Sequence, residues 1–131
     1  MKQKHAENAP PTAVDLVDRL IGEAMRRRGS DLHFEPTDQA MVVRMRIDGL
    51  LQDVERLPGV VAPSVIGRLK VLAGLLTYRM DIPQEGRIDS AGRPWPGVAD
   101  LRLSVFPTIR GERAVVRLFE SRGEPMALEG L

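Results

Sequence analysis

Two apolar-alternating segments joined by a turn constrain the fold of this 131-residue chain more than any other feature. Residues 100–106 and 113–119 alternate apolar with polar side chains, and a Pro-Thr-Ile-Arg-Gly-Glu turn at 107–112 connects them. This period-two pattern is typical of an antiparallel β-hairpin with one buried face. The hairpin places Arg102 and Arg117 on neighbouring strands. Because a guanidinium matches phosphate or carboxylate with two parallel hydrogen bonds, such a pair is suited to clamping a phosphate.

The remainder of the chain switches between helical and strand periodicity. Thr12 is expected to cap a helix over 13–28, with Asp15 in capping-box spacing and Gly29 as the stop. Later segments show either period-two alternation or the three- and four-residue apolar spacing of a helix. They predict strands at 31–36, 40–47 and 50–55, a helix over 62–76, a loop over 79–87 and a short strand near 87–90.

This order of a helix, three strands, a helix and three strands predicts an α+β fold. We expect an antiparallel sheet of about six strands with two main helices packed on one face, and a hairpin turn at Asp48-Gly49. Polar, proline-ended residues 1–11 predict a flexible leader, and residues 12–120 form the domain. The Gly, Glu and Pro content of 121–131 predicts a linker.

Charge and composition exclude several classes of function. Nineteen basic against 18 acidic side chains give a net charge of +1, which is too balanced for direct binding of nucleic acid through its phosphates. The chain has no cysteine, so disulfides, thiol catalysis and the usual structural zinc sites are excluded. No apolar run approaches the roughly 20 residues of a membrane span, and residues 1–11 lack the apolar centre of a signal peptide. These features predict a cytoplasmic location.

Catalytic motifs are missing as well. The serines lack a Gly-x-Ser-x-Gly context, and His5 lies in the predicted leader. No Gly-x-x-x-x-Gly-Lys-[Ser/Thr] motif occurs, and no glycine precedes a lysine. By itself the chain is therefore not expected to cradle and hydrolyse a nucleotide in P-loop fashion. We predict no catalytic residue in it.

Asp31, His33 and Glu35 are expected to project from one face of the first strand, because alternate strand residues point the same way. A histidine between two carboxylates can bind a metal or transfer protons. Successive members of this set would lie about 7 Å apart along the strand, which is wide for three ligands of one ion. We therefore expect hydrogen bonding or an interface role, and no metal.

Arg102 and Arg117 also have a simpler interpretation. Arginines on the outer face of a sheet commonly pair with nearby carboxylates and contribute little energy. The nearby carboxylates in the sequence are Asp100, Glu112 and Glu120. The residue pattern alone leaves open whether the two arginines bind an anion or only these neighbours.

Several motifs, taken in order, resemble those of the secretion ATPases, the hexameric motors of type II secretion, type IV pilus extension and competence pseudopili. The resemblance covers about residues 13–131. It lies in the domain that precedes the P-loop core of that family, which is usually described as PAS-like. The motifs are Gly-Ser-Asp-Leu-His-Phe-Glu-Pro at 29–36, Val-Arg-Met-Arg-Ile-Asp-Gly at 43–49, Arg-Leu-Lys at 68–70, Pro-Gln-Glu-Gly-Arg at 83–87, Asp-Leu-Arg-Leu-Ser at 100–104 and Pro-Thr-Ile-Arg-Gly-Glu at 107–112.

The resemblance implies a nucleotide-sensing regulatory domain that packs on the ATPase core and moves as a rigid body when ATP binds. In the family, two arginines of this domain reach the ATP phosphates, and they correspond to Arg102 and Arg117 here. These two contacts would be shared with the core. Five other motif residues are expected to be structural or interface residues, namely Asp31, His33, Glu35, Asp48 and Arg87.

The resemblance also implies cofactors and partners for the full-length protein. It would bind ATP and Mg²⁺, whereas the residues present here would bind neither stably. Its partners would be its own C-terminal ATPase core, neighbouring subunits of a hexamer and the inner-membrane secretion or pilus platform. The assembled protein would be cytoplasmic and peripheral to the bacterial inner membrane. Residues 126–131 resemble the family's linker before the core, so the protein is expected to continue.

Two segments depart from the family pattern. Residues 78–82, Tyr-Arg-Met-Asp-Ile, alter the order of charges. The loop at 91–97 is longer than usual, and we expect Trp95 to be exposed or to cap the sheet edge. An alternative function also stays open, a stand-alone PAS-like module that binds a ligand or a protein without a motor. That alternative predicts an apolar cavity of ligand size.

Overall fold

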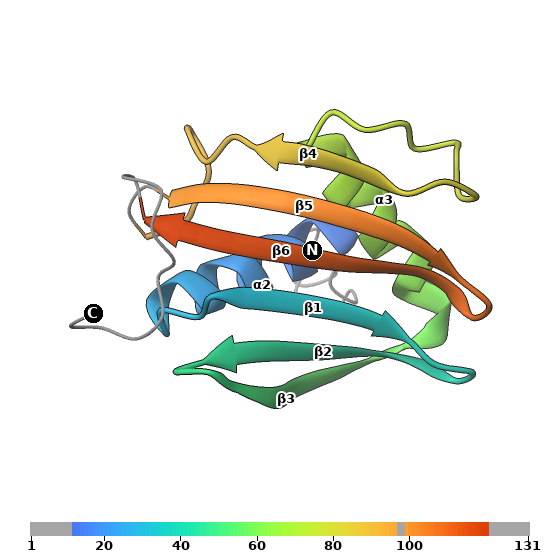
Figure 1. The fold of residues 1–131 in the computed structure, drawn as a ribbon, viewed down its shortest axis with the longest axis horizontal. Helices are drawn as coiled ribbons and strands as arrows, with labels where there is room; N and C mark the ends of the chain where they lie inside the picture. Colours follow the sequence, from blue (N-terminus) through green and yellow to red (C-terminus); the bar gives the residue numbers. More distant parts are fainter. Residues whose placement is uncertain (1–11, 97–98, 121–131) are drawn as a thin grey trace, which may run out of the picture.

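The computed structural model describes residues 12–96 and 99–120. These residues form two α-helices, a short 3-10 helix and six β-strands (Figure 1). The predicted leader at 1–11 and linker at 121–131 lie outside the described residues, as does the side chain of Glu120. In chain order the elements are α2 (Ala13–Arg26), β1 (Asp31–Pro36), β2 (Ala40–Ile47), β3 (Leu50–Pro58), η1 (Gly59–Val61), α3 (Ala62–Leu72), β4 (Gln84–Ile88), β5 (Ala99–Thr108) and β6 (Gly111–Glu120).

The six strands form one antiparallel sheet in the order β3-β2-β1-β6-β5-β4. Strands β1 and β6 pair in the middle, so they join the N-terminal meander to the C-terminal hairpin. Helices α2 and α3 lie against the same face of the sheet, and no helix among the described residues covers the other face (Figure 1). The predicted α+β fold is therefore confirmed. We call the uncovered side the open face.

Helix α2 begins where the sequence predicted and ends two residues earlier. Thr12 caps it, because its hydroxyl accepts a hydrogen bond from a backbone N–H of the first turn at 3.1 Å. The helix ends at Arg26, and Arg28 takes a left-handed conformation with φ of 56°. Gly29, the predicted stop, has another role: a Cβ there would lie 3.1 Å from the Met45 side chain. Glycine at this position lets the helix end pack against β2.

Helix α3 ends at Leu72, although the apolar spacing predicted a helix to residue 76. Gly74 has a φ of 69°, which is outside the helical range, so the chain turns away. Beyond the turn, the backbone of Leu76 exchanges hydrogen bonds of 2.8 and 3.0 Å with the side-chain amide of Gln84. The expected last helical turn thus leads into β4. None of the helices in residues 12–96 and 99–120 is long and apolar enough to cross a bilayer.

Strand pairing moves three other boundaries. β3 continues to Pro58, beyond the predicted end at residue 55, because residues 56–58 also pair with β2. β4 begins at Gln84, inside the predicted loop, because residues 84–88 pair with β5. The turn between β5 and β6 narrows to residues 109–110, because Pro107 and Thr108 also pair with β6. The predictions of a strand at 87–90 and a turn at 107–112 were therefore wrong in extent.

The core lies between the sheet and the two helices. Along β1, Leu32 and Phe34 are fully buried against the helices. Lys70 of α3 is buried too, with 1% of its side chain exposed, and its ammonium lies 2.7 Å from the Glu112 carboxylate of β6. The same ammonium donates to the carbonyl of Arg79 at 2.7 Å. This buried ion pair ties α3, the loop after it and the β5–β6 hairpin together.

Trp95 is buried, so the expectation that it is exposed or caps the sheet edge was wrong. Its indole Nε1–H donates to the carbonyl of Asp18 in α2 at 3.1 Å. The ring lies 3.5 Å from the position that a Cβ on Gly22 would take. Trp95 therefore packs against α2.

Candidate functional site: an arginine row on the open sheet face

The open face of the sheet carries a row of charged side chains that crosses five strands. Strand register aligns Arg46 of β2 with Asp31 of β1, and Asp31 with Arg117 of β6. It then aligns Arg117 with Arg102 of β5, and Arg102 with Arg87 of β4. Adjacent strands lie about 4.8 Å apart, so these five residues occupy neighbouring positions. We call them the arginine row.

Asp31 supplies the negative charge in one half of the row. Its carboxylate accepts hydrogen bonds from Arg117 Nε at 3.1 Å and from Ser30 Oγ at 2.9 Å. The Nε of Arg46 lies 3.6 Å away, and Arg46 is also tied to the Gly49 carbonyl through Nη1 at 3.0 Å. Arg46 is therefore drawn back toward the β2–β3 turn. Arg117 keeps 65% of its side chain exposed.

Asp100 supplies the negative charge for the other half of the row, although it is not one of the five row residues. Its carboxylate accepts a hydrogen bond from Arg102 Nη2 at 2.9 Å, and Arg87 Nε lies 3.1 Å from it. The hydrogen bond from Arg102 contributes most to holding the pKa of Asp100 below its ordinary value, so the carboxylate is ionised at neutral pH. The guanidinium of Arg102 also lies 6.0 Å from the centre of the Phe119 ring, within the range of a cation–π contact.

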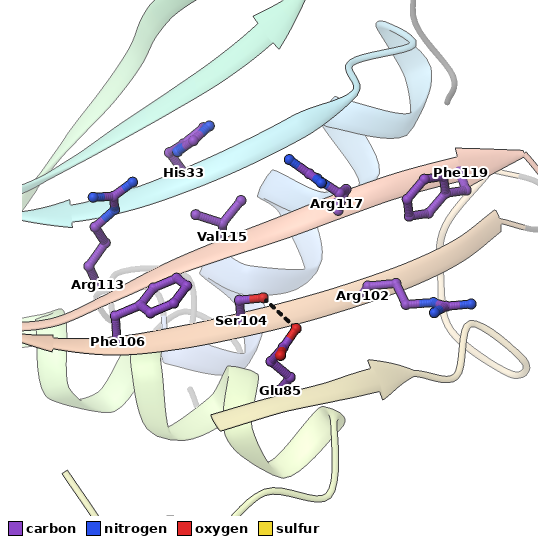
Figure 2. Close-up of a pocket in the computed structure, with 9 residues that line it drawn as sticks. All are labelled: His33, Glu85, Arg102, Ser104, Phe106, Arg113, Val115, Arg117 and Phe119. Atoms are coloured by element: carbon purple, nitrogen blue, oxygen red, sulfur yellow. Dashed lines mark hydrogen bonds between the residues drawn. The ribbon is translucent and has the colours of Figure 1, made fainter. Parts of the chain in front are cut away.

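A depression of about 490 Å³ lies on this face beside Arg102 and Arg117 (Figure 2). Arg113 lies at one end of it and Phe119 at the other, with Val115 between them on the same strand. Figure 2 shows the guanidinium groups of Arg117 and Arg102 turned apart, the first toward β1 and the second along β5. Simultaneous contact of both with one phosphate therefore requires at least one side chain to rotate.

The simpler interpretation of the two predicted arginines holds for one of them. Arg102 pairs with Asp100, as that interpretation expected. Arg117 pairs instead with Asp31, which belongs to a strand far away in the sequence. Glu112, another predicted partner, pairs with a buried lysine of the core. Both arginines are thus ion-paired, and both keep more than half of their side chains exposed.

Two other predicted residues, Glu35 and Asp48, lie outside the arginine row. Glu35 is on the same face as Asp31 and lies 3.5 Å from Arg44. Asp48 lies in the turn between β2 and β3 with a φ of 51°, next to Gly49 with a φ of 83°. Neither of these two carboxylates contacts the row. Glu35 thus pairs with an arginine outside the row, and Asp48 forms part of a turn.

The sequence pattern did not predict that Arg87 lies in the arginine row. The predicted strand at 87–90 put Arg87 at a strand end, whereas β4 runs over 84–88 and sets it opposite Arg102. The alternation of exposed Glu85 and Arg87 with buried Ile88 was the available signal. The glycine at position 86 weakened it, because glycine is rare in strands.

His33 lies in the lining of the depression, next to the arginine row. Neither of its ring nitrogens has a hydrogen-bond partner among the described residues. Burial lowers the pKa of His33, and this effect outweighs the carboxylates of Asp31 and Glu35, which raise it. The imidazole is therefore neutral at pH 7.

We expect His33 to make the fold less stable in mild acid. The folded state resists protonation of His33, so between its lowered pKa and about 6.5 the unfolded chain binds more protons. The free energy of unfolding should therefore decrease as the pH falls from 7.5 to 5. Urea denaturation of the chain and of a His33→Gln variant at both pH values measures this effect. An equal decrease in the variant would show that other groups cause it.

Comparisons with known proteins give relatives over most of the chain. The sequence model of a family described as type II/IV secretion system protein matches residues 5–131. The type IV pilus assembly ATPase PilB of Pseudomonas aeruginosa is 36% identical over 126 residues, which are 96% of this chain and 22% of PilB. The type II secretion system protein E of the same organism is 36% identical over 120 residues, which are 90% of this chain and 23% of that protein. The chain thus spans less than a quarter of either relative.

The fold is also similar to that of a solved structure, the pilus retraction motor PilT with bound ADP. The TM-score is 0.52, the sequence identity is 20%, and the match covers 76% of this chain and 28% of PilT. At this level of identity the similarity concerns the fold alone. It agrees with the antiparallel sheet and paired helices described above.

Proposed function

This chain belongs to the type II/IV secretion system protein family, and on that premise we propose that it is the nucleotide-sensing domain of a secretion or pilus-assembly ATPase. In this proposal, Arg102 and Arg117 contact the phosphates of ATP held by a P-loop core. The contact couples ATP binding to a rigid-body movement of the domain, which powers the assembly of pilins or pseudopilins. The domain has no turnover of its own, because the chain carries no P-loop motif.

One observation carries this proposal: Arg102 and Arg117 are cross-strand neighbours on the open face, with 59% and 65% of their side chains exposed. Each is held by an aspartate that is itself only 12–13% exposed. A guanidinium has five N–H donors, so pairing with one carboxylate leaves donors for a second anion. The four arginines of the row exceed the charge of Asp31 and Asp100, which favours a phosphate at this surface.

The proposed chemistry is stabilisation of charge on the γ-phosphate. Phosphoryl transfer depends mainly on positioning and on cations placed where negative charge develops. Arginines on a separate domain supply that charge only when the domain is docked on the nucleotide. Hydrolysis would therefore depend on the position of this domain, which makes the arginines sensors of bound ATP.

The partners follow from the same proposal. PilB and the type II secretion system protein E are described as a pilus assembly ATPase and a secretion protein. We infer that this domain contacts its own ATPase core, neighbouring subunits of a hexamer and the inner-membrane platform of the secretion or pilus machine. ATP and Mg²⁺ would be bound by the core. The assembly would lie in the cytoplasm, peripheral to the inner membrane.

Substituting Arg102 or Arg117 with alanine tests the proposal in the full-length ATPase. Each change is expected to lower the rate of ATP hydrolysis about 10- to 100-fold, because a hydrogen bond to a charged group contributes roughly 1.5–3 kcal/mol. The measurement is the steady-state release of phosphate by purified protein whose oligomeric state matches that of the unchanged enzyme.

Arg79→Ala is a matched control for these variants. Arg79 is a partly exposed arginine that pairs with Asp81 at 2.9 Å in the loop after α3, away from the arginine row. Its loss removes the same charge and should leave hydrolysis nearly unchanged. Normal hydrolysis by both Arg102→Ala and Arg117→Ala would contradict the assignment of these residues.

A further inference from the structure

Arg87 is the arginine that the structure holds beside Arg102. The Nε of Arg87 lies 3.1 Å and the Nε of Arg102 3.4 Å from the same oxygen of Asp100, Oδ1. The pairing of β4 with β5 sets the two arginines directly opposite each other. Arg117, by contrast, is held by Asp31, and its guanidinium turns away from Arg102 (Figure 2). Two guanidinium groups thus meet at one carboxylate on the β4 side of the row.

These contacts with Asp100 use only part of the hydrogen-bonding capacity of the two arginines. Arg87 contacts the carboxylate through Nε, and Arg102 contacts it through Nε and Nη2. With five N–H donors on each guanidinium, several donors of the pair are left over. The side chains of Arg87 and Arg102 are 71% and 59% exposed, so the remaining donors are accessible from the open face.

Asp100 makes this arrangement possible. Two cations at adjacent cross-strand positions repel each other unless an anion lies between them. Asp100 has only 13% of its side chain exposed, and the contact with Arg102 keeps it ionised. Phe119, the cross-strand partner of Asp100, lies under the Arg102 guanidinium at cation–π distance. Together with Asp100 the pair has a net charge of +1, and it is positioned before any anion arrives.

We propose that Arg87 is a third phosphate-contacting arginine, and that Asp100 positions Arg87 and Arg102 as one phosphate-binding pair. The inference rests on the proposed function for the identity of the anion, the phosphate chain of ATP. Arg117, Arg102 and Arg87 occupy three adjacent strands, a span of about 10 Å. This span suits a chain of phosphates better than a single phosphate. Arg46 is outside the site, since it lies on β2, two strands beyond Arg117 on β6.

Binding of inorganic tripolyphosphate to the 131-residue chain tests this assignment. Titrations followed by NMR at low salt, with the arginine Nε–Hε signals as reporters, detect weak binding. Arg87→Ala and Arg102→Ala are each expected to weaken binding about 10-fold, which corresponds to one lost charge-assisted contact. Arg87→Lys should weaken binding less than Arg87→Ala, because lysine keeps the positive charge although it lacks the paired N–H donors of a guanidinium. The control Arg79→Ala should change it less than about 2-fold.

Asp100→Asn separates positioning from simple competition. The change removes a negative charge. If Asp100 only competed with phosphate for the two arginines, the variant would bind tripolyphosphate more tightly. A positioning role predicts the opposite, about 5- to 10-fold weaker binding, together with loss of the distinct Nε–Hε signals of Arg87 and Arg102, since one charge-assisted contact to each is lost. Tighter binding by Asp100→Asn would overturn the positioning role.

The remaining outcomes separate this inference from the proposed function. If Arg102→Ala and Arg117→Ala weaken tripolyphosphate binding and Arg87→Ala does not, Arg87 is no phosphate contact, while the proposed function stands. If the unchanged chain shows no binding, or if all three variants bind like it, the inference fails, whereas the proposed function is decided by the hydrolysis rates of the full-length Arg102→Ala and Arg117→Ala variants. ATP in place of tripolyphosphate should give the same factor for Arg87→Ala. A loss seen only with ATP would assign Arg87 to the base or sugar and overturn the inference.

Discussion

Replacing Lys70 with alanine is expected to lower the free energy of unfolding by about 3–5 kcal/mol, because it leaves a buried carboxylate without its cation. The Lys70 ammonium lies 2.7 Å from Glu112, and the two side chains are 1% and 10% exposed. Water cannot replace the lost partner at such a site without disturbing the packing. Urea denaturation of the 131-residue chain, followed by circular dichroism, measures the change.

Two comparisons show whether the buried position of this ion pair is the cause. Arg19 forms two 2.9 Å hydrogen bonds with Glu55 at the surface, so Arg19→Ala should cost less than about 1 kcal/mol. The double variant Lys70→Met with Glu112→Leu removes both charges and should recover much of the stability, since apolar pairs often replace buried ion pairs without loss. A cost for Lys70→Ala no larger than that for Arg19→Ala would contradict this account.

Gly86→Val is expected to be the second severe change, with a loss of about 3 kcal/mol in the free energy of unfolding. A Cβ at Gly86 would lie 2.6 Å from the carbonyl oxygen of Ala73 and 2.8 Å from the Leu75 side chain. The first of these is a backbone atom, which cannot rotate out of the way. β4 would have to move off the segment that follows α3, and Arg87 would move with it. Denaturation measures the loss of stability.

Gly67→Ala provides a control of opposite sign. Gly67 lies inside α3, and nothing lies within 4 Å of the position that its Cβ would take. Alanine there should raise the free energy of unfolding by about 1 kcal/mol, because it favours the helix. If Gly86→Val were as stable as the unchanged chain, the close approach of β4 to the segment after α3 would not restrict the size of the side chain at position 86. Tripolyphosphate titration of Gly86→Val would then also be expected to match the unchanged chain.

Local patterns were sufficient for the number and type of the main elements. Alternation predicted β2 at its exact bounds, because the Asp48-Gly49 turn that ends it has the positive φ angles that the dipeptide favours. Apolar spacing predicted both helices. It failed at the end of α3, because Gly74 and the hydrogen bonds of Gln84 redirect a segment whose leucines continue the helical spacing. The spacing of apolar residues along a helix does not predict such contacts with residues outside that helix.

The candidate site was predictable only where it depends on a single hairpin. Alternation places Arg102 and Arg117 on one face of two adjacent strands, and the structure has them opposite each other. The alternation does not show that Asp31 holds Arg117, because the pairing of β1 with β6 joins residues 86 positions apart. Nor does the alternation predict the contact of Arg87 with Asp100, because this contact depends on the register of β4 with β5.

The sequence by itself determined the α+β class, the hairpin with its two arginines and the absence of a P-loop, because each follows from neighbouring residues. Only the tertiary structure decided which carboxylate holds which arginine, where β4 begins and how Trp95 is buried. Those features arise when distant strands and helices pack together. A period of two or 3.6 residues specifies which side of an element is buried, but not which partner covers it or in what register.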